Sequence, residues 1–294
     1  MYSSRSLPDK FGKAPGVKSF SKVRSLWHDW LPPCSNPACK QKPLARAMAK
    51  RNTGISVADK WICGPDCFEE IAREKLSAIM SSRHAQEQPP KLRMPLGLVM
   101  VSRGDLTPEQ LRLVLDEQQK RGSNVGDIAQ RLGFATQEQV TAAVAAQWSC
   151  GVFPLRDRPL TPSVHVPRRL LEVYGMLPVH YVETGRRLMV GFVTRVQYHI
   201  LHTIEHITSC VATPCFITAG EYDQYLHSAT FGERENEIVF DRVNGTVEMA
   251  KLARNYVNQI AAHQARFGIC RDYLWMRIWG SRNEMDLLFH LQPE

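Results

Sequence analysis

A 24-residue pattern that occurs twice constrains the fold of this chain more than any other feature of its sequence. The first copy is PLGLVMVSRGDLTPEQLRLVLDEQ, from Pro95 to Gln118, and the second is NVGDIAQRLGFATQEQVTAAVAAQ, from Asn124 to Gln147. Five residues, QKRGS, separate the copies. The coinciding positions are Gly97/Gly126, Gly104/Gly133, Thr107/Thr136, Glu109/Glu138, Gln110/Gln139 and Gln118/Gln147. A repeat divides a chain into matched units, so we expect two related units in one subdomain.

Each copy carries the signals of a helix start followed by one apolar face. Thr107 suits the N-cap position, Pro108 the first helical position, and Gln110 the closing position of a capping box. The second copy repeats this arrangement from Thr136 to Gln139. Aliphatic residues then recur at helical spacing, at Leu111, Val114 and Leu115 in the first copy and at Val140, Ala143 and Val144 in the second. The pattern predicts a small helical subdomain.

The pattern resembles the MshEN domain, which stands at the N-terminus of type II secretion (protein E) and type IV pilus assembly ATPases. That family has two motifs of the form RLGxxLVxxGxLxxxxLxxALxxQ with a five-residue spacer. The resemblance, which covers roughly residues 92–230, implies a fold that binds the second messenger cyclic di-GMP, with one motif for each guanine. The positions that the resemblance assigns to the ligand are Leu96, Gly97, Leu111, Leu115, Gln118, Val125, Gly126, Val140, Val144 and Gln147.

This chain departs from the family pattern at the first position of both motifs. The family has an arginine there, whereas this chain has Pro95 and Asn124. Both motifs therefore lack the guanidinium group, a planar bidentate donor, at their first position. Arg93, Arg121 and Arg131 lie nearby in the sequence. Two hypotheses stay open: the repeat still binds cyclic di-GMP, or it is a structural remnant or docking module.

Four cysteines precede the repeat in two short-spaced pairs. Cys34 and Cys39 form one pair, Cys63 and Cys67 the other, and each pair lies on a turn that contains Pro or Gly. Four thiolates are what a tetrahedral zinc site needs. We expect a structural zinc ion; four unlinked cysteines, an iron–sulfur cluster or a redox pair are the alternatives.

The residues after the repeat alternate between strand and helix patterns. The patterns predict strands at 186–193 and 211–218 and helices at 197–207 and 221–229. This order is similar to the second half of the same ATPase N-terminal domain. A helix at 246–267 and a β-hairpin formed by 272–279 and 285–291 follow.

One string in the predicted helix at 197–207 has the order of a known metal motif. His202-Thr-Ile-Glu205-His206 is the HxxEH string of inverted zinc metallopeptidases. We interpret it as a partly exposed helix, with an incidental metal site and a catalytic zinc as alternatives. Cys210 and Cys215 flank the next strand and are interpreted as buried small side chains.

The predicted fold class is α+β: a tandem-repeat helical subdomain plus a small α/β layer, preceded by a four-cysteine zinc-binding segment. The expected divisions are a basic disordered arm (1–33), the zinc segment (34–88), the repeat (89–150), the α/β subdomain (151–232) and a helix plus β-hairpin extension (233–294). Net charge is uneven, because residues 1–94 carry 17 Lys+Arg and 8 Asp+Glu. Such an arm can contact nucleic acid, anionic lipid or an acidic protein.

These features favour a non-catalytic regulatory or adaptor protein over an enzyme. The phosphate-binding string GxxxxGK[ST] occurs nowhere, so we expect no ATP hydrolysis by the mechanism of the ATPases that the repeat resembles. The expected partner is a secretion, pilus or signalling protein. A cyclic di-GMP sensor is one alternative, and nucleic-acid binding through the arm and zinc segment is another. Without a secretory signal or a long apolar run, we expect a cytoplasmic protein with reduced thiols.

Overall fold

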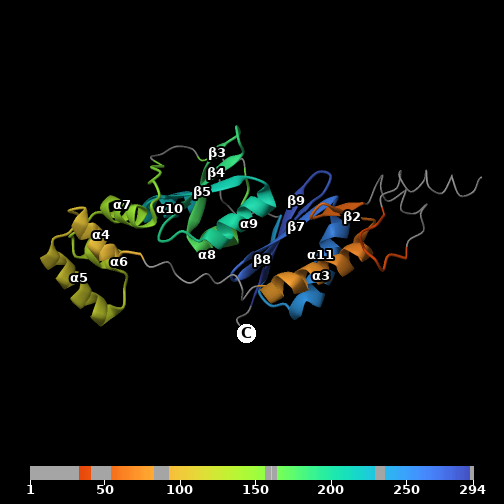
Figure 1. Cartoon of the computed structure of the whole chain (residues 1–294), viewed down its shortest axis with the longest axis horizontal. Helices are drawn as coiled ribbons and strands as arrows, with labels where there is room; N and C mark the ends of the chain where they lie inside the picture. The colour runs from red at the N-terminus through yellow and green to blue at the C-terminus, as the bar shows by residue number, and fades with distance from the viewer. Residues whose placement is uncertain are drawn as a thin grey trace, which may run out of the picture.

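The structure, a computed structural model, describes residues 33–40, 54–82, 93–155, 160, 164–228 and 236–291. All but the last residue of the expected basic arm therefore lies outside the described residues. The fold is α+β, with a six-stranded sheet and a three-stranded sheet. Figure 1 shows helices α4 to α7 at one end of the molecule, the three-stranded sheet in the middle, and the six-stranded sheet with α3 and α11 at the other end.

The repeated stretch forms four helices, and each copy supplies a short helix and a longer one. They are α4 (Leu96–Ser102), α5 (Pro108–Arg121), α6 (Val125–Arg131) and α7 (Gln137–Trp148). Both longer helices begin with the predicted capping box, at Thr107 with Gln110 and at Thr136 with Gln139. The short helix of each copy packs against the long helix of the other, α4 on α7 and α6 on α5. A small apolar core that includes Met100, Val114 and Ile128 fills the space between them.

The middle of the molecule is a small α/β layer. It contains α8 (Arg168–Tyr174), β3 (Met176–Val182), β4 (Arg187–Phe192), α9 (Tyr198–Thr208), β5 (Val211–Phe216) and α10 (Ala219–Leu226). The strand order is β3-β4-β5, with β3 antiparallel and β5 parallel to β4. Helix α9 is the crossover between the two parallel strands. The predicted strands and helices of this region are confirmed, and β3 is an additional strand before them.

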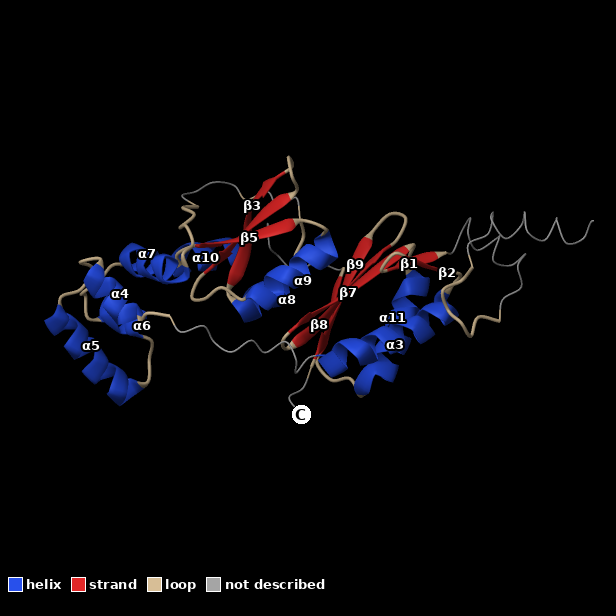
Figure 2. Ribbon diagram, in the orientation of Figure 1, coloured by secondary structure: helices blue, strands red, loops and turns tan. Residues whose placement is uncertain are grey.

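The six-stranded sheet combines residues from both sides of the repeat. Its strands, in spatial order, are β2 (Lys60–Ile62), β1 (Ile55–Val57), β7 (Gln264–Cys270), β8 (Tyr273–Trp279), β9 (Glu284–His290) and β6 (Glu237–Phe240). Strand β1 runs parallel to β7, with Ser56 opposite Gln264. Figure 2 shows α3 (Pro65–Ser82) and α11 (Gly245–Gln259) side by side on one face of this sheet. The expected zinc segment and the expected C-terminal extension thus share one sheet and one core.

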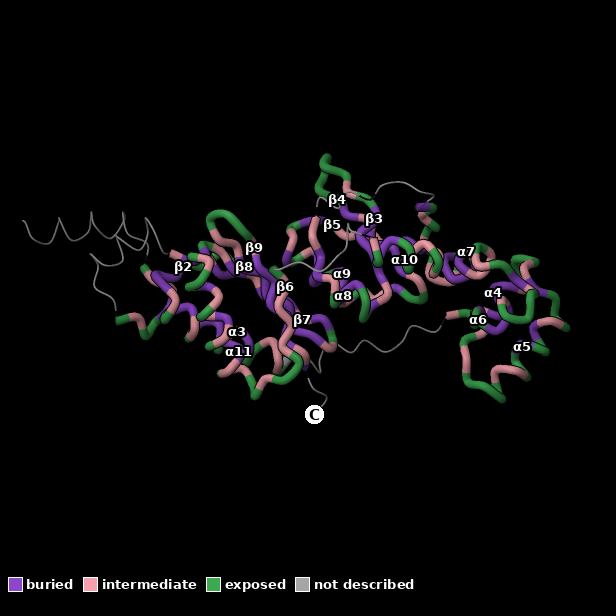
Figure 3. The backbone as a smooth tube through the Cα atoms, turned by 180° about the vertical axis from the view of Figure 1, so that it is seen from behind, coloured by how far each residue is buried: buried purple, intermediate pink, exposed green. Residues whose placement is uncertain are grey.

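Both faces of this sheet are covered. Along β8, Leu274, Met276 and Ile278 belong to the core under α3 and α11, whereas Tyr273 and Trp275 belong to the core of the α/β layer. This alternation is the period of two that a strand imposes on its side chains. Helix α9 packs on β7, so the α/β layer covers the second face. Figure 3 shows buried residues along the strands of this sheet, whereas α5 is largely exposed or half-buried.

The C-terminal region corrects one predicted boundary. The expected helix at 246–267 ends at Gln259, and residues from Gln264 onward form strand β7. Ala261 has a φ of 47°, a left-handed conformation that ends the helix without the glycine that usually marks such a turn. The predicted hairpin is confirmed as β8 and β9, with Tyr273 opposite His290. None of the helices in the described part of the chain combines the length and the apolar character of a membrane span.

Candidate metal centre and repeat site

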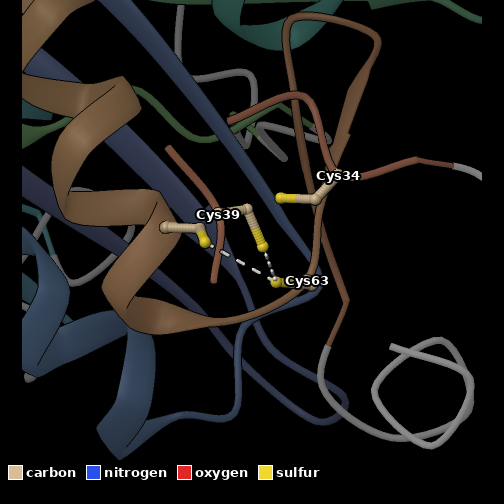
Figure 4. Close-up of side chains that lie close together, drawn as sticks. Cys34, Cys39 and Cys63 are labelled. Carbon is tan, nitrogen blue, oxygen red and sulfur yellow. Dashed lines mark hydrogen bonds between the residues drawn. The ribbon is translucent and has the colours of Figure 1, made fainter. Parts of the chain in front are cut away.

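The four N-terminal cysteines come together in the structure. The sulfurs of Cys34, Cys39, Cys63 and Cys67 all lie within 4.8 Å of one another. Cys63 Sγ is 3.5 Å from Cys39 Sγ and 3.6 Å from Cys67 Sγ. Zinc–sulfur bonds of about 2.3 Å place the thiolates of a tetrahedral site about 3.8 Å apart, so the spacing suits one ion. Figure 4 shows the side chains of Cys34, Cys39 and Cys63 turned toward one another.

Three elements position these sulfurs. Cys34 and Cys39 lie on the loop 33–40, and the Ser35 N–H ties this loop to β2 by donating to the carbonyl of Trp61 at 2.9 Å. Cys63 follows β2 directly, and Cys67 lies in the first turn of α3. A helix N-terminus favours a negative charge, so this turn suits a thiolate. The loop is thereby held against β2 and α3.

Asn36 supports the cluster and was not singled out from the sequence. It is only 5% exposed, and its Oδ1 accepts a hydrogen bond from the Ala38 N–H at 2.9 Å. Its Nδ2 donates to Glu70 on α3. Burial raises the pKa of Cys67 to about 11, and a hydrogen bond with Asn36 acts in the opposite direction. Asn36 therefore stabilises the thiolate that a metal ion needs, and the Asn36-Pro37 turn is the sequence signal that could have found it.

Burial affects the cluster unevenly. Cys63 and Cys67 are buried, whereas Cys34 and Cys39 are half-buried. Burial, followed by the hydrogen bond with Cys39, raises the pKa of Cys63 far above its ordinary value. Without an ion, these inner thiols hold their protons, so metal binding must displace them. Four thiolates around one ion leave no open coordination position, which is the arrangement of a structural zinc site.

In the repeat, the motif glycines Gly97 and Gly126 allow close helix contacts. A Cβ on Gly97 would lie 2.4 Å from Leu111 Cδ1, and a Cβ on Gly126 would lie 2.7 Å from Val140 Cγ1. Real side chains do not approach this closely, so both positions require glycine or a shift of the neighbour. The matched contacts, Gly97 with Leu111 and Gly126 with Val140, occupy the same positions of the two copies.

The last glutamine of each copy contacts the residue before a copy begins. Gln118 Nε2 donates to the carbonyl of Ser123 at 3.1 Å, directly before the second copy. Gln147 Nε2 donates to the carbonyl of Met94 at 2.7 Å, directly before the first. Each glutamine thus forms a hydrogen bond with the backbone directly before the other copy. This contact is a structural role for two residues that the family resemblance assigns to a ligand.

The remaining ligand positions differ between the copies. Leu115 is 41% exposed on α5, whereas Val144, at the same motif position, is 7% exposed and lies in the core of the α/β layer. Leu96 and Val140 are half-buried between that core and the repeat core, and Val125 packs against the repeat core. The ten positions therefore do not form one uniform surface.

The altered first positions and the nearby arginines have distinct environments. Pro95 and Asn124 are the N-cap residues of α4 and α6. The Arg93 guanidinium carbon lies 3.4 Å from the centre of the Trp148 ring, a cation–π contact. Arg121 pairs with Glu117 on its own helix, and Arg131 is exposed. Arg93 directly precedes Met94, whose carbonyl accepts the hydrogen bond from Gln147 at the end of the second copy.

Comparisons with known proteins concern less than half of the chain. No protein-family model matches it, and no curated protein matches it. Among solved structures, the chain is similar to a structure of MshE with cdg, with 18% sequence identity and a TM-score of 0.40; the match covers 46% of this chain and 97% of that chain. It is also similar to the N-terminal domain of XpsE, with 15% identity and a TM-score of 0.35, over 45% of this chain and 91% of that chain.

Proposed function

We propose that this chain is a non-catalytic regulatory or adaptor protein with an MshEN-like tandem-repeat subdomain, acting in a secretion, pilus or nucleotide-signalling system. The observation that carries the proposal is the matched geometry of the two copies. Both copies have the capped helix, and both place the motif glycine against the aliphatic residue of the same position. The missing GxxxxGK[ST] string supports a role without ATP hydrolysis.

In this proposal a structural zinc ion fastens the N-terminal segment to the C-terminal sheet. The support is the spacing of the four sulfurs and the parallel pairing of β1 with β7. Metal analysis after metal-replete expression tests it. We expect about one zinc per chain in the wild type and strong loss in C63S and C67S. Cys270→Ser is the matched control, because Cys270 is buried in another core. Far less than one zinc per chain in the wild type would remove the zinc centre from the proposal.

A second candidate function is a cyclic di-GMP sensor, which Arg93 favours. Its guanidinium carbon lies 3.4 Å from the centre of the Trp148 ring, and Arg93 stands two residues before the first copy, so it is a candidate to replace a missing motif arginine. Calorimetric titration of cyclic di-GMP into the full chain decides between sensor and docking module. A sensor predicts binding at or below the order of tens of micromolar that weakens in R93A. Arg282→Ala is the control, since Arg282 is exposed between β8 and β9, outside the repeat. If titration of cyclic di-GMP into the wild type gives no heat, the sensor hypothesis fails and the docking-module hypothesis remains.

The non-catalytic role has its own test. We expect the zinc-loaded chain to release no phosphate from ATP above the background of a mock preparation. ATP hydrolysis that copurifies with the chain and is lost in one of its own point variants contradicts the non-catalytic role.

A further inference from the structure

Helix α9 presents two histidines on one exposed face. His202 and His206 are four residues apart, a spacing that places both side chains on the same side of a helix. The His202 side chain is 76% exposed, and His206 is exposed as well. In helical zinc motifs, two histidines at this spacing bind one ion. The buried residues of α9 lie on the opposite side, so the pair is not needed for its packing.

Glu205 lies between His202 and the sheet. Its Oε2 lies 3.4 Å from His202 Nδ1, which leaves Nε2 of that ring for a metal ion. Its Oε1 accepts a hydrogen bond from the Ala212 N–H of β5 at 2.9 Å, so the carboxylate is anchored to the sheet. A carboxylate that holds the second nitrogen of a histidine orients the ring and strengthens it as a ligand.

The opposite end of the same helix is less suited to a cation. His199 is also on this side, but its Nε2 is buried and has no hydrogen-bond partner. Burial, followed by Arg271, lowers the pKa of His199, and Arg195 acts in the same direction. These guanidinium groups repel a metal ion there. At the other end, Arg266 is turned to the backbone, where it donates to the carbonyl of His206 at 3.0 Å.

We propose that His202 and His206 bind a divalent transition ion, of the class of Ni²⁺, Cu²⁺ or Zn²⁺, with water in the other coordination positions. Imidazole ligands suit these ions, and Glu205 orients the His202 ring through its Nδ1. The site is chemically distinct from the cysteine centre, because two exposed imidazoles exchange their ion readily. An ion across one turn of α9 also stabilises the helix that joins the α/β layer to β7.

Calorimetric titration of Ni²⁺ tests the proposal. The sample is the full chain with its cysteine centre first loaded with zinc, at about pH 7.5, because a metal ion binds the neutral form of imidazole. We expect one nickel ion per chain. Affinity falls at least about 10-fold in H202A and in H206A, and about 10-fold in E205Q, which keeps an oxygen for the Ala212 N–H. His263→Ala is the matched control, because this exposed histidine lies in the connection between α11 and β7 and its loss should leave the affinity unchanged.

Three outcomes overturn the proposal. Nickel affinity in the H202A/H206A double variant equal to that of the wild type shows that the ion binds elsewhere. Release of zinc during the titration, followed with a zinc-sensitive dye, assigns the heat to the cysteines. A loss of affinity in H263A equal to that in H202A indicates general surface binding. Circular dichroism of each variant checks that the fold is intact. We expect the wild-type spectrum, because the substituted side chains are exposed.

Discussion

Arg277 and Asp286 form a buried, two-pronged ion pair across strands β8 and β9. Arg277 Nε and Nη2 donate to Asp286 Oδ1 and Oδ2, each at 2.7 Å, and the side chains are 4% and 2% exposed. Trp275 Nε1 donates to the same carboxylate at 2.7 Å, and Arg277 Nη2 also donates to the carbonyl of His165 at 2.9 Å. Burial lowers the pKa of Arg277, but Asp286 outweighs it and the net shift is upward. The pair joins the sheet to the segment that enters α8.

Removal of the carboxylate in Asp286→Asn should destabilise the protein strongly, because it leaves the Arg277 guanidinium buried without a counter-charge. We expect a loss of about 3–5 kcal/mol in the free energy of unfolding, measured by urea denaturation. Glu172→Gln removes the partner of Arg168 from a more exposed pair and should have a much smaller effect. Equal effects of the two substitutions contradict the structural role of the buried pair.

Gly268 of β7 lies directly against Thr203 of α9, and substitution of this glycine should push the two elements apart. A Cβ at this position would lie 2.4 Å from Thr203 Cγ2. We expect Gly268→Ala to reduce the free energy of unfolding by about 1–3 kcal/mol. The second change Thr203→Ser should restore much of the loss, because serine lacks that methyl but keeps the hydroxyl that donates to the carbonyl of Ile269.

The control for this prediction is Gly151→Ala. A Cβ there would meet nothing within 4 Å, so the substitution should be nearly neutral. If T203S fails to rescue G268A, the cost of G268A does not come from the contact with α9.

The buried end of His199 should make the protein sensitive to mild acid. Its folded pKa lies below the ordinary value, chiefly because of burial. The unfolded chain therefore takes up a proton first, so the stability contributed by neutral His199 is complete above about pH 6.5 and is lost as pH falls through the folded pKa. Arg271, Arg195 and His202 add to this effect, and Asp272 opposes it.

Replacement of His199 by phenylalanine provides the measurement. Phenylalanine keeps a ring beside Tyr174, whose centre is 5.6 Å from that of His199. We expect the difference in unfolding free energy between about pH 7.5 and about pH 5.5 to be smaller in H199F than in the wild type. An identical pH dependence in both proteins would show that His199 does not carry the acid sensitivity.

Gln147 should stabilise the repeat through its contact with the start of the first copy. In Gln147→Ala the hydrogen bond to the Met94 carbonyl is lost, which should cost about 1 kcal/mol. Gln147→Glu should cost more, because a carboxylate cannot donate to that carbonyl. Hydrogen exchange in α4 and α7 measures the effect, and Gln119→Ala, exposed on α5, is the control. Unchanged hydrogen exchange in both Gln147 variants would contradict this structural role and favour a ligand-binding role for Gln147.

Local chemistry made several features of the fold predictable from the sequence. The capping boxes at Thr107 and Thr136 depend on residues three positions apart, so the sequence contains all that they need. The β8–β9 hairpin is similarly local, with a short connection between two apolar strands. The two cysteine pairs predicted a four-sulfur cluster by residue type and spacing, and their sulfurs do come together in the structure.

Tertiary contacts decided the rest. Strand β1 has only three residues, and in the sequence the repeat and the α/β layer separate it from its partner β7. No local pattern therefore links the two strands. Leu115 and Val144 hold the same motif position, yet one is exposed and the other buried, because the α/β layer covers α7 and not α5. A sequence pattern records which side chains favour burial. Which surface buries them depends on packing between segments distant in the chain, and only the folded structure contains that information.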